Sequence, residues 1–195
     1  MRNHAQGIVA CDFFTVVTVR FRVVYVFVVM ELGLRRILHY GVTQHPTADW
    51  TLQHFRELLP GGHPYRCVIH DRDSIFPTRL DQVLAALGVT VLRTPVRAPT
   101  VNARCERRVG SIRRECLDLM IPFGEQHLRR ALKAWVTHYN HARIHMSLGP
   151  GIPAALRPPP AETTERHRLP DGHTVGCRAV LGGLHHEYWL EKAAA

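Results

Sequence analysis

The 195-residue sequence is poor in cysteine and has no long hydrophobic run. Its five cysteines are scattered at positions 11, 67, 105, 116 and 177, and no pair has the Cys-x-x-Cys spacing. This distribution excludes a disulfide framework and favours reduced thiols, so we expect a cytoplasmic protein. The apolar run at residues 23–30 is too short to span a membrane, and Arg20 and Arg22 exclude an N-terminal signal peptide.

Acidic residues are also scarce, at 16 against 25 lysines and arginines, which leaves a formal net charge of +9. A charge of this sign favours an anionic partner, and nucleic acid is the usual one.

The length and the 46% hydrophobic content allow one domain plus a tail. We predict a core domain over residues 1–150. Residues 151–195 are predicted to form a proline-rich linker and a short C-terminal β-hairpin tail, with Gly182-Gly183 as a two-residue turn.

Hydrophobic periodicity predicts an α/β fold. Runs rich in Val, Phe, Tyr and Ile predict strands at 8–17, 21–30 and 35–43, and the short connections between them indicate an antiparallel meander. Helices predicted at 47–59 and 77–87 are each followed by a short strand, which indicates two parallel strands added by crossovers. Two more helices are predicted at 103–120 and 125–142. The expected sheet is therefore five-stranded and mixed, with three antiparallel and two parallel strands flanked by helices.

Three acidic residues occupy positions where a charge is costly unless it has a function. Asp12 is the single charge in the apolar strand 8–17, and Asp71 follows the buried strand that ends near Ile69. Glu106 lies in the first turns of the helix predicted from residue 103. Polar groups at the carboxyl ends of strands are typical of functional sites in open sheets. Three carboxylates that meet would offer the hard oxygen ligands that magnesium or manganese prefers.

Five motifs occur in a fixed order along the chain, at residues 10–16, 70–76, 93–99, 102–107 and 139–145. In this order they resemble the catalytic core of the integrase and insertion-sequence transposase superfamily, the DDE recombinases. The interval from Asp71 to Glu106 is close to the spacing usual in that superfamily. The resemblance implies a ribonuclease H-like fold, which agrees with the sheet predicted above, and metal-dependent DNA cleavage and strand transfer.

The predicted chemistry uses two divalent ions, Mg²⁺ or Mn²⁺, held by the three acids. Asp12 is assigned as the bridging ligand, Asp71 as the ligand of one ion and Glu106 as the ligand of the other. Asp73 competes with Asp71, because it stands where the family pattern Asp-Asn-Gly has glycine. Glu31, close to a turn, is predicted to be solvated.

Four arginines are the predicted DNA contacts. Arg113 lies two helical turns after Glu106 on the same face, where the resembled transposases carry a basic residue. Arg107 and Arg114 extend the basic helix, and Arg97 lies in the loop before it.

The spacing of His138, His141 and His145 is compatible with a zinc site, but no cysteine or carboxylate nearby completes four ligands. The family pattern Tyr-Asn-x-x-Arg-Pro-His accounts better for this segment, with Ile144 in place of proline.

The sequence begins almost at its first strand, so we expect a truncated or split form of a transposase or integrase. Its expected partners are DNA, further copies of itself on DNA, and a separate end-binding protein or domain; no membrane partner is expected. Two alternatives stay open. One is a ribonuclease H-like nuclease, and the other is a catalytically silent DNA-binding remnant.

Overall fold

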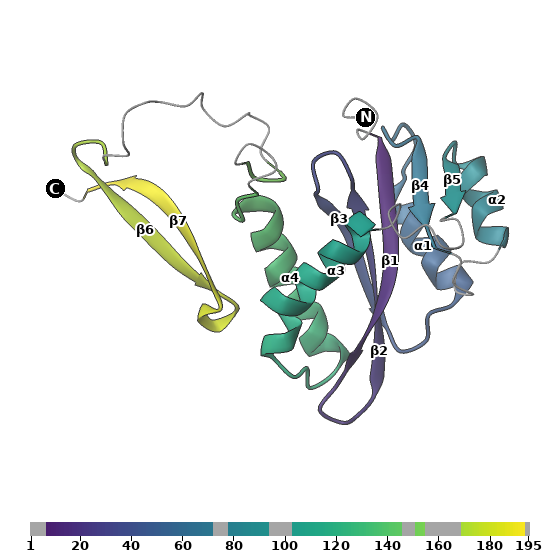
Figure 1. The fold of residues 1–195 in the computed structure, drawn as a ribbon, viewed down its shortest axis with the longest axis horizontal. Helices are drawn as coiled ribbons and strands as arrows, with labels where there is room; N and C mark the ends of the chain where they lie inside the picture. Colours follow the sequence, from purple (N-terminus) through teal and green to yellow (C-terminus); the bar gives the residue numbers. More distant parts are fainter. Residues whose placement is uncertain (1–6, 72–77, 94–102, 146–150, 155–168, 194–195) are drawn as a thin grey trace. The chain divides into compact units, whose positions relative to one another are not determined.

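The computed structural model describes residues 7–71, 78–93, 103–145, 151–154 and 169–193 (Figure 1). The chain divides into two compact units, residues 1–130 and 131–195, and the division falls within helix α4 (Glu125–His141). The domain boundary predicted at residue 150 lies outside the described residues. No helix in the described ranges combines the length and hydrophobicity needed to cross a membrane.

The first unit is built on a five-stranded sheet with the order β3-β2-β1-β4-β5 (Figure 1). Strands β1 and β2 pair antiparallel, as do β2 and β3, whereas β4 pairs parallel with β1 and β5 pairs parallel with β4. The bounds are β1 Ile8–Val17, β2 Val23–Glu31, β3 Ile37–Thr43, β4 Cys67–His70 and β5 Thr90–Arg93. The predicted mixed sheet of three antiparallel and two parallel strands is confirmed.

Helices α1 (Ala48–Leu58), α2 (Thr78–Ala86) and α3 (Ala103–Glu115) complete the first unit with the start of α4. The hydroxyl of Thr47 caps α1 by accepting a hydrogen bond from the Trp50 N–H at 3.2 Å. Helix α3 is shorter than predicted. Cys116 has φ −139° and ψ −63°, which ends the helix, and a 3₁₀ turn at Leu117–Leu119 follows.

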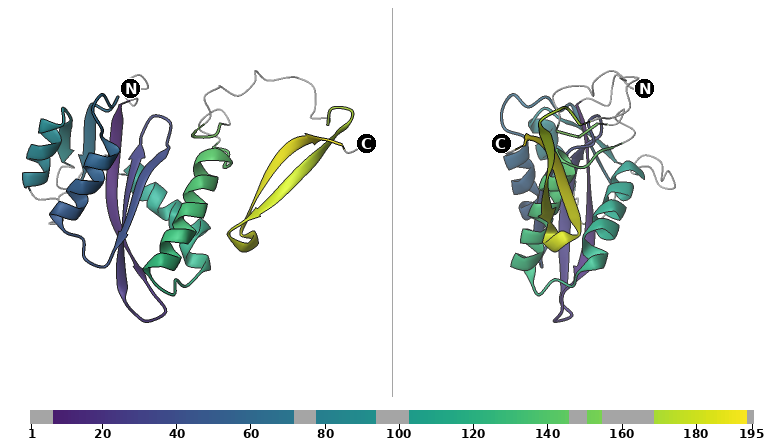
Figure 2. Two further views of the ribbon diagram at one scale, coloured as in Figure 1. Left: turned by 180° about the vertical axis from the view of Figure 1, so that it is seen from behind. Right: turned by 90° about the vertical axis from the view of Figure 1, so that its left-hand side faces the viewer.

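The two faces of the sheet pack against different helices, because consecutive residues of β1 alternate in direction. Val9 and Cys11 belong to a hydrophobic cluster that includes Leu52 and Phe55 of α1 and Leu80 of α2. Ala10, on the opposite face, packs in a second cluster with Met30, Ile69 and Cys105 of α3. Figure 2 shows α1 and α3 on opposite sides of the sheet. We call these the α1 face and the α3 face.

On the α1 face, a glycine lets aromatic rings approach the backbone of β3. A Cβ atom placed on Gly41 would lie 2.5 Å from Cη2 of Trp50 and 2.8 Å from Nε2 of His54. His54 also contacts His39, with 2.6 Å between its Nδ1 and Nε2 of His39. Burial, and then the neighbouring His54, lowers the pKa of His39 to about 4, so the His39 ring is neutral near pH 7. Burial also lowers the pKa of His54.

The prediction for Glu31 is wrong. Glu31 is buried at the end of β2 rather than solvated, and its carboxylate lies 3.4 Å from the guanidinium of Arg36. The turn after Glu31 brings Arg36 back beside it, and the Glu31 N–H donates to the Arg36 carbonyl at 2.9 Å. A buried carboxylate needs a partner of this kind.

The second unit contains a β-hairpin of strands β6 (His173–Val180) and β7 (His185–Lys192). The predicted two-residue turn is wrong, because residues 181–184 connect the strands and Leu181, Gly182 and Gly183 all have positive φ. Each strand has 8 residues, so the hairpin is longer than the short one predicted. The strands carry many charged and polar residues and are mostly exposed, so their apolar alternation is weak.

Replacement of Gly41 by alanine is predicted to lower the free energy of unfolding by about 1–3 kcal/mol, because the new methyl group would force the Trp50 and His54 rings to move. Urea denaturation measures the change. Gly61→Ala is the matched control, since nothing lies near its added Cβ, and it should change stability by less than about 0.5 kcal/mol. Equal losses in the two variants would show that the Gly41 contact is not tight.

Candidate metal and DNA site

Asp12 lies in β1, and Asp71 directly follows β4, the parallel neighbour of β1. Strands β1 and β4 pair Ile8 with Cys67 and Ala10 with Ile69, and the same register continued by two residues places Asp71 beside Asp12. Both side chains are half-buried, and Oδ1 of Asp12 accepts a hydrogen bond from the Phe13 N–H at 2.8 Å. Both residues follow Ala10 and Ile69 by two positions, so both belong to the α3 face.

Glu106 reaches the same face from α3. The preceding residue, Cys105, is fully buried in the cluster formed with Ala10 and Ile69, which fixes the start of α3 over β1 and β4. Glu106 itself is exposed at the edge of this contact. The sheet and the helix therefore bring three carboxylates, far apart in sequence, to one face of the molecule.

All three carboxylates affect the pKa of the Cys105 thiol. Burial raises its pKa well above the usual range, and the charges of Asp12, Glu106 and Asp71 raise it further. The nearby Arg108 charge acts in the opposite direction. The pKa of Cys11 is raised in the same way, by burial and then by Cys105, Asp12 and Asp71. The negative charges thus gather around the two buried thiols, while the individual metal-binding roles remain a prediction.

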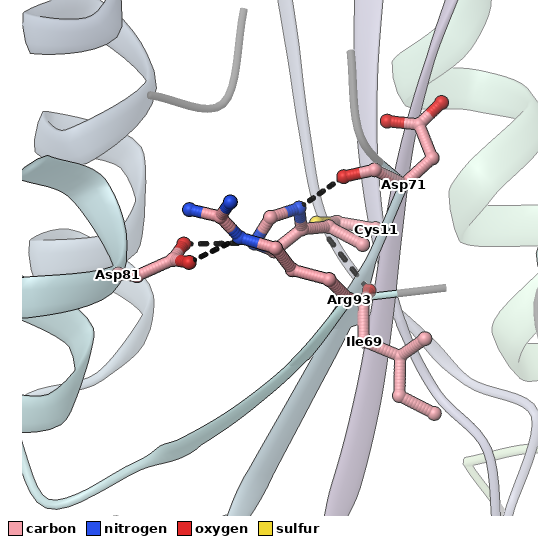
Figure 3. A network of polar contacts seen from close by, with 6 residues as sticks. Cys11, Ile69, Asp71, Asp81 and Arg93 are labelled. Atoms are coloured by element: carbon pink, nitrogen blue, oxygen red, sulfur yellow. Dashed lines mark hydrogen bonds and ion pairs between the residues drawn. The ribbon is translucent and has the colours of Figure 1, made fainter. Parts of the chain in front are cut away.

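A polar network holds the backbone at Asp71 (Figure 3). The ring of His70 is fully buried, with Nδ1 at 2.5 Å from the Asp71 carbonyl oxygen and Nε2 at 2.9 Å from Oδ1 of Asp81. The other Asp81 oxygen accepts from Nε of Arg93 at 2.6 Å. On the neighbouring strand, the Cys11 thiol donates to the Ile69 carbonyl at 3.7 Å. Figure 3 shows the Asp71 carboxylate pointing away from Asp81 and Arg93, while its backbone carbonyl contacts His70.

The buried His70 ring contacts two oxygen atoms, the backbone carbonyl of Asp71 and the carboxylate of Asp81. The same Asp81 carboxylate also contacts the guanidinium of Arg93. His70, Asp81 and Arg93 together join β4, α2 and β5 directly behind the candidate metal ligand.

Sequence reasoning missed His70 and Asp81. The available signal was weak: His70 ends an apolar strand, and Asp81 follows the buried Leu80 in the first turn of α2. Asp73, the predicted rival of Asp71, lies outside the described residues, so the choice between the two stays a prediction.

The predicted DNA-binding arginines differ in their surroundings. Arg107 and Arg114 are exposed on α3, and the Arg114 guanidinium lies over Gly110 of the same helix. Arg113 is attached to β1, because its Nη2 donates to the Thr15 carbonyl at 3.0 Å and its guanidinium lies 5.3 Å from the centre of the Phe14 ring. Arg97 lies outside the described residues. Arg107 and Arg114 are therefore the described arginines of this set best placed to reach a phosphate.

The three histidines near the end of α4 have separate contacts in the second unit. His138 lies 3.2 Å from Glu187 and stacks on His185 with 4.8 Å between ring centres. His141 contacts the Thr137 carbonyl of its own helix, whereas His145 packs edge-on against Tyr139. Each of the three rings thus has different neighbours.

Comparison with protein families gives a match between the integrase core domain family and residues 87–153, a stretch that includes Glu106. No curated protein sequence matches the chain. Solved structures resemble a larger part of the chain than the family match covers. The Mos1 transposase catalytic domain, solved with raltegravir and Mg, has a TM-score of 0.58 at 14% identity, over 68% of this chain and 72% of that one.

Two viral structures share the same fold. A chain of the simian T-cell lymphotropic virus intasome has a TM-score of 0.63 at 10% identity, over 97% of this chain and 79% of that one. The BIV integrase catalytic core has a TM-score of 0.51 at 16% identity, over 76% of this chain and 91% of that one. Together with the family match, these likenesses confirm the predicted resemblance to integrase and transposase catalytic cores and the ribonuclease H-like fold class.

Replacement of Asp81 by asparagine is predicted to lower the free energy of unfolding by about 1–3 kcal/mol, because His70 and Arg93 would lose a charged acceptor in a mostly buried site. Chemical denaturation at neutral pH measures the loss. The control is Asp49→Asn, which removes an exposed ion pair with Arg79 and should cost no more than about 1 kcal/mol. A loss at Asp81 no larger than that at Asp49 would contradict a supporting role for the network.

Proposed function

We propose that this chain is an integrase or transposase catalytic core that cleaves DNA strands and joins them to new sites with the help of magnesium or manganese. The observation that carries the proposal is the placement of Asp12 in β1 and of Asp71 directly after the parallel strand β4, both on the face of the sheet to which α3 brings Glu106. Burial is the main cause of the raised pKa of Cys105, and the further effect of all three carboxylates on that thiol agrees with this arrangement.

The donor set suits hard divalent cations. It consists of carboxylate oxygens, without a sulfur or imidazole ligand among the three residues, and Mg²⁺ and Mn²⁺ prefer oxygen ligands. Asp12 would bridge two ions, Asp71 would hold one and Glu106 the other. When bound, such ions activate a water or hydroxyl nucleophile and stabilise charge on the leaving oxygen of a phosphodiester. The Mg in the Mos1 transposase catalytic domain supports the same class of cofactor here.

The protein's own residues would position the substrate and the ligands. His70 donates to the Asp71 backbone and keeps that residue at the strand end, while the Phe13 N–H holds one oxygen of Asp12. Arg107 and Arg114, exposed on the helix that carries Glu106, would bind phosphates of the DNA backbone. Arg113 would act mainly by fixing α3 to β1 through Thr15.

The proposal includes assembly on DNA. Joining two element ends to one target requires more than one active site, so the proposed working form is a homo-oligomer. The likeness to a chain of a viral intasome supports this form. Arginine contacts to phosphates carry no base information, so the recognition of element ends is assigned to a separate end-binding protein or domain.

Replacement of Asp12 by asparagine is predicted to reduce Mg²⁺-dependent nicking or strand transfer by about two to three orders of magnitude, because it removes the charge of the bridging ligand. The assay is the release or joining of labelled strands from a panel of candidate terminal sequences, with chelator as the metal-free reference. Asp118→Asn is the control, since Asp118 is exposed beyond the end of α3.

Three results would contradict this role of Asp12. Nicking that survives chelator would exclude metal-dependent chemistry, and full activity in the Asp12 variant would exclude its role as a ligand. DNA binding without any metal-dependent nicking of any duplex would favour the silent remnant.

Replacement of Arg107 by glutamine is predicted to weaken binding to all duplexes similarly. The slope of log K against log salt should fall by about 0.9 for each phosphate that the variant no longer neutralises. Fluorescence anisotropy over a salt series measures both effects. Arg56→Gln is the matched control, because Arg56 is exposed on α1, on the opposite side of the sheet. If the two variants have the same slope, α3 is not the DNA-binding helix.

A further inference from the structure

Two histidines and a glutamate meet on the α1 face, away from the three carboxylates. Asp12 pairs with Val28 of β2, and Val28 pairs with Tyr40 of β3, so Tyr40 belongs to the same face as Asp12. His39, the preceding residue of β3, therefore belongs to the opposite face. There it meets His54 and Glu57, which are three residues apart on α1.

The three side chains converge on one point. Nε2 of His39 and Nδ1 of His54 are 2.6 Å apart, and Nδ1 of His54 is 3.8 Å from Oε2 of Glu57. One ligand atom from each residue lies within 4.8 Å of the other two. Two imidazole nitrogens and a carboxylate oxygen at such separations can reach a single ion at ordinary bond lengths of about 2.0–2.2 Å after small side-chain shifts.

The surroundings orient these ligand atoms. The His54 ring lies edge-on to Trp50, with 4.0 Å between ring centres, and its Nε2 faces Gly41. That packing directs Nδ1 of His54 toward His39 and Glu57. Gln53 donates to Oε1 of Glu57 at 3.1 Å, which leaves Oε2 on the histidine side. His54 is mostly buried, whereas the Glu57 side chain is 52% exposed, so an ion can enter from solvent at the glutamate.

We propose that His39, His54 and Glu57 form a binding site for a borderline divalent metal of the zinc class, which joins α1 to β3. Imidazole nitrogen selects zinc, cobalt or nickel over magnesium, so this site differs chemically from the all-carboxylate site on the other face. Three protein ligands leave one position of a tetrahedral ion for water or an outside ligand.

Binding would replace the hydrogen bond between the two rings. Both inward nitrogens must be unprotonated to bind the ion, so each neutral ring would carry its proton on the outward nitrogen, Nδ1 of His39 and Nε2 of His54. The neighbouring cation, Arg129, is already held by Glu125 at 2.6 Å and by the Val42 carbonyl, which reduces its repulsion of a bound ion.

Metal titration of the chelator-treated full chain tests the proposal. Zn²⁺ in competition with a chromophoric chelator should reveal one tight site per chain, and Co²⁺ should give the visible absorption of a tetrahedral complex. Mg²⁺ in large excess should not displace either ion. No tight zinc site, or a zinc site that magnesium displaces, would overturn the proposal.

Variants locate the site within the chain. Glu57→Gln keeps the size and exposure of the side chain and should weaken Zn²⁺ and Co²⁺ binding at least about tenfold. His54→Gln should abolish the tetrahedral cobalt spectrum. Asp49→Asn, on the same helix and outside the cluster, and His45→Gln, at an exposed histidine, are the controls and should bind as the unaltered chain does. Equal zinc affinity in Glu57→Gln and Asp49→Asn would show that the ion binds elsewhere.

Thermal unfolding gives a second, independent measurement. A metal that binds the folded state in preference to the unfolded state raises the unfolding temperature, and the shift grows with the logarithm of the ratio of metal concentration to Kd. Zn²⁺ should raise the midpoint of the unaltered chain and of Asp49→Asn, and the shift should be smaller in Glu57→Gln. A zinc shift of the same size in all three proteins would contradict a site that joins α1 to β3.

Discussion

The parallel pairing of β1 with β4 is the constraint on which the candidate site depends. Its register directs Asp12 and Asp71 to the same face of the sheet, and the buried Cys105 fixes α3 over the same two strands. Carboxylates brought to one face repel one another, and a bound divalent cation would offset that repulsion. The proposed function therefore assigns these three residues to metal ions.

The sheet separates two different chemistries. The α3 face gathers carboxylates, which suit magnesium, whereas the α1 face brings two imidazoles and one carboxylate together between β3 and α1. The alternation of side chains along β1 and β3 produces this separation, because a shift of one residue in register would move every side chain to the other face. The His70 network joins β4, α2 and β5 behind Asp71, so the candidate ligand depends on a support that is itself buried.

The strands of the first unit were predictable because their apolar, β-branched residues form long runs, and β1 was predicted with its observed bounds. The contacts of individual polar side chains were not predictable. Glu31 was expected in solvent, but the return of the chain to Arg36 buries it, and periodicity carries no information about that pairing. Periodicity also carries no information about the contact of His70 with Asp81 or of His39 with His54, because each contact joins residues of two different elements. The hairpin of the second unit was predicted too short, because its exposed strands lack a strong apolar alternation.

The central claim is that Asp12, Asp71 and Glu106 hold divalent ions together. Crystallography of the chain soaked with Mn²⁺, using the anomalous signal of manganese, tests it most directly. The account predicts two peaks about 3.5–4 Å apart, both in contact with Asp12, with Asp71 on one ion and Glu106 on the other. Manganese bound away from Asp12, or an Asp71 carboxylate turned from the ions with Asp73 in its place, would contradict it.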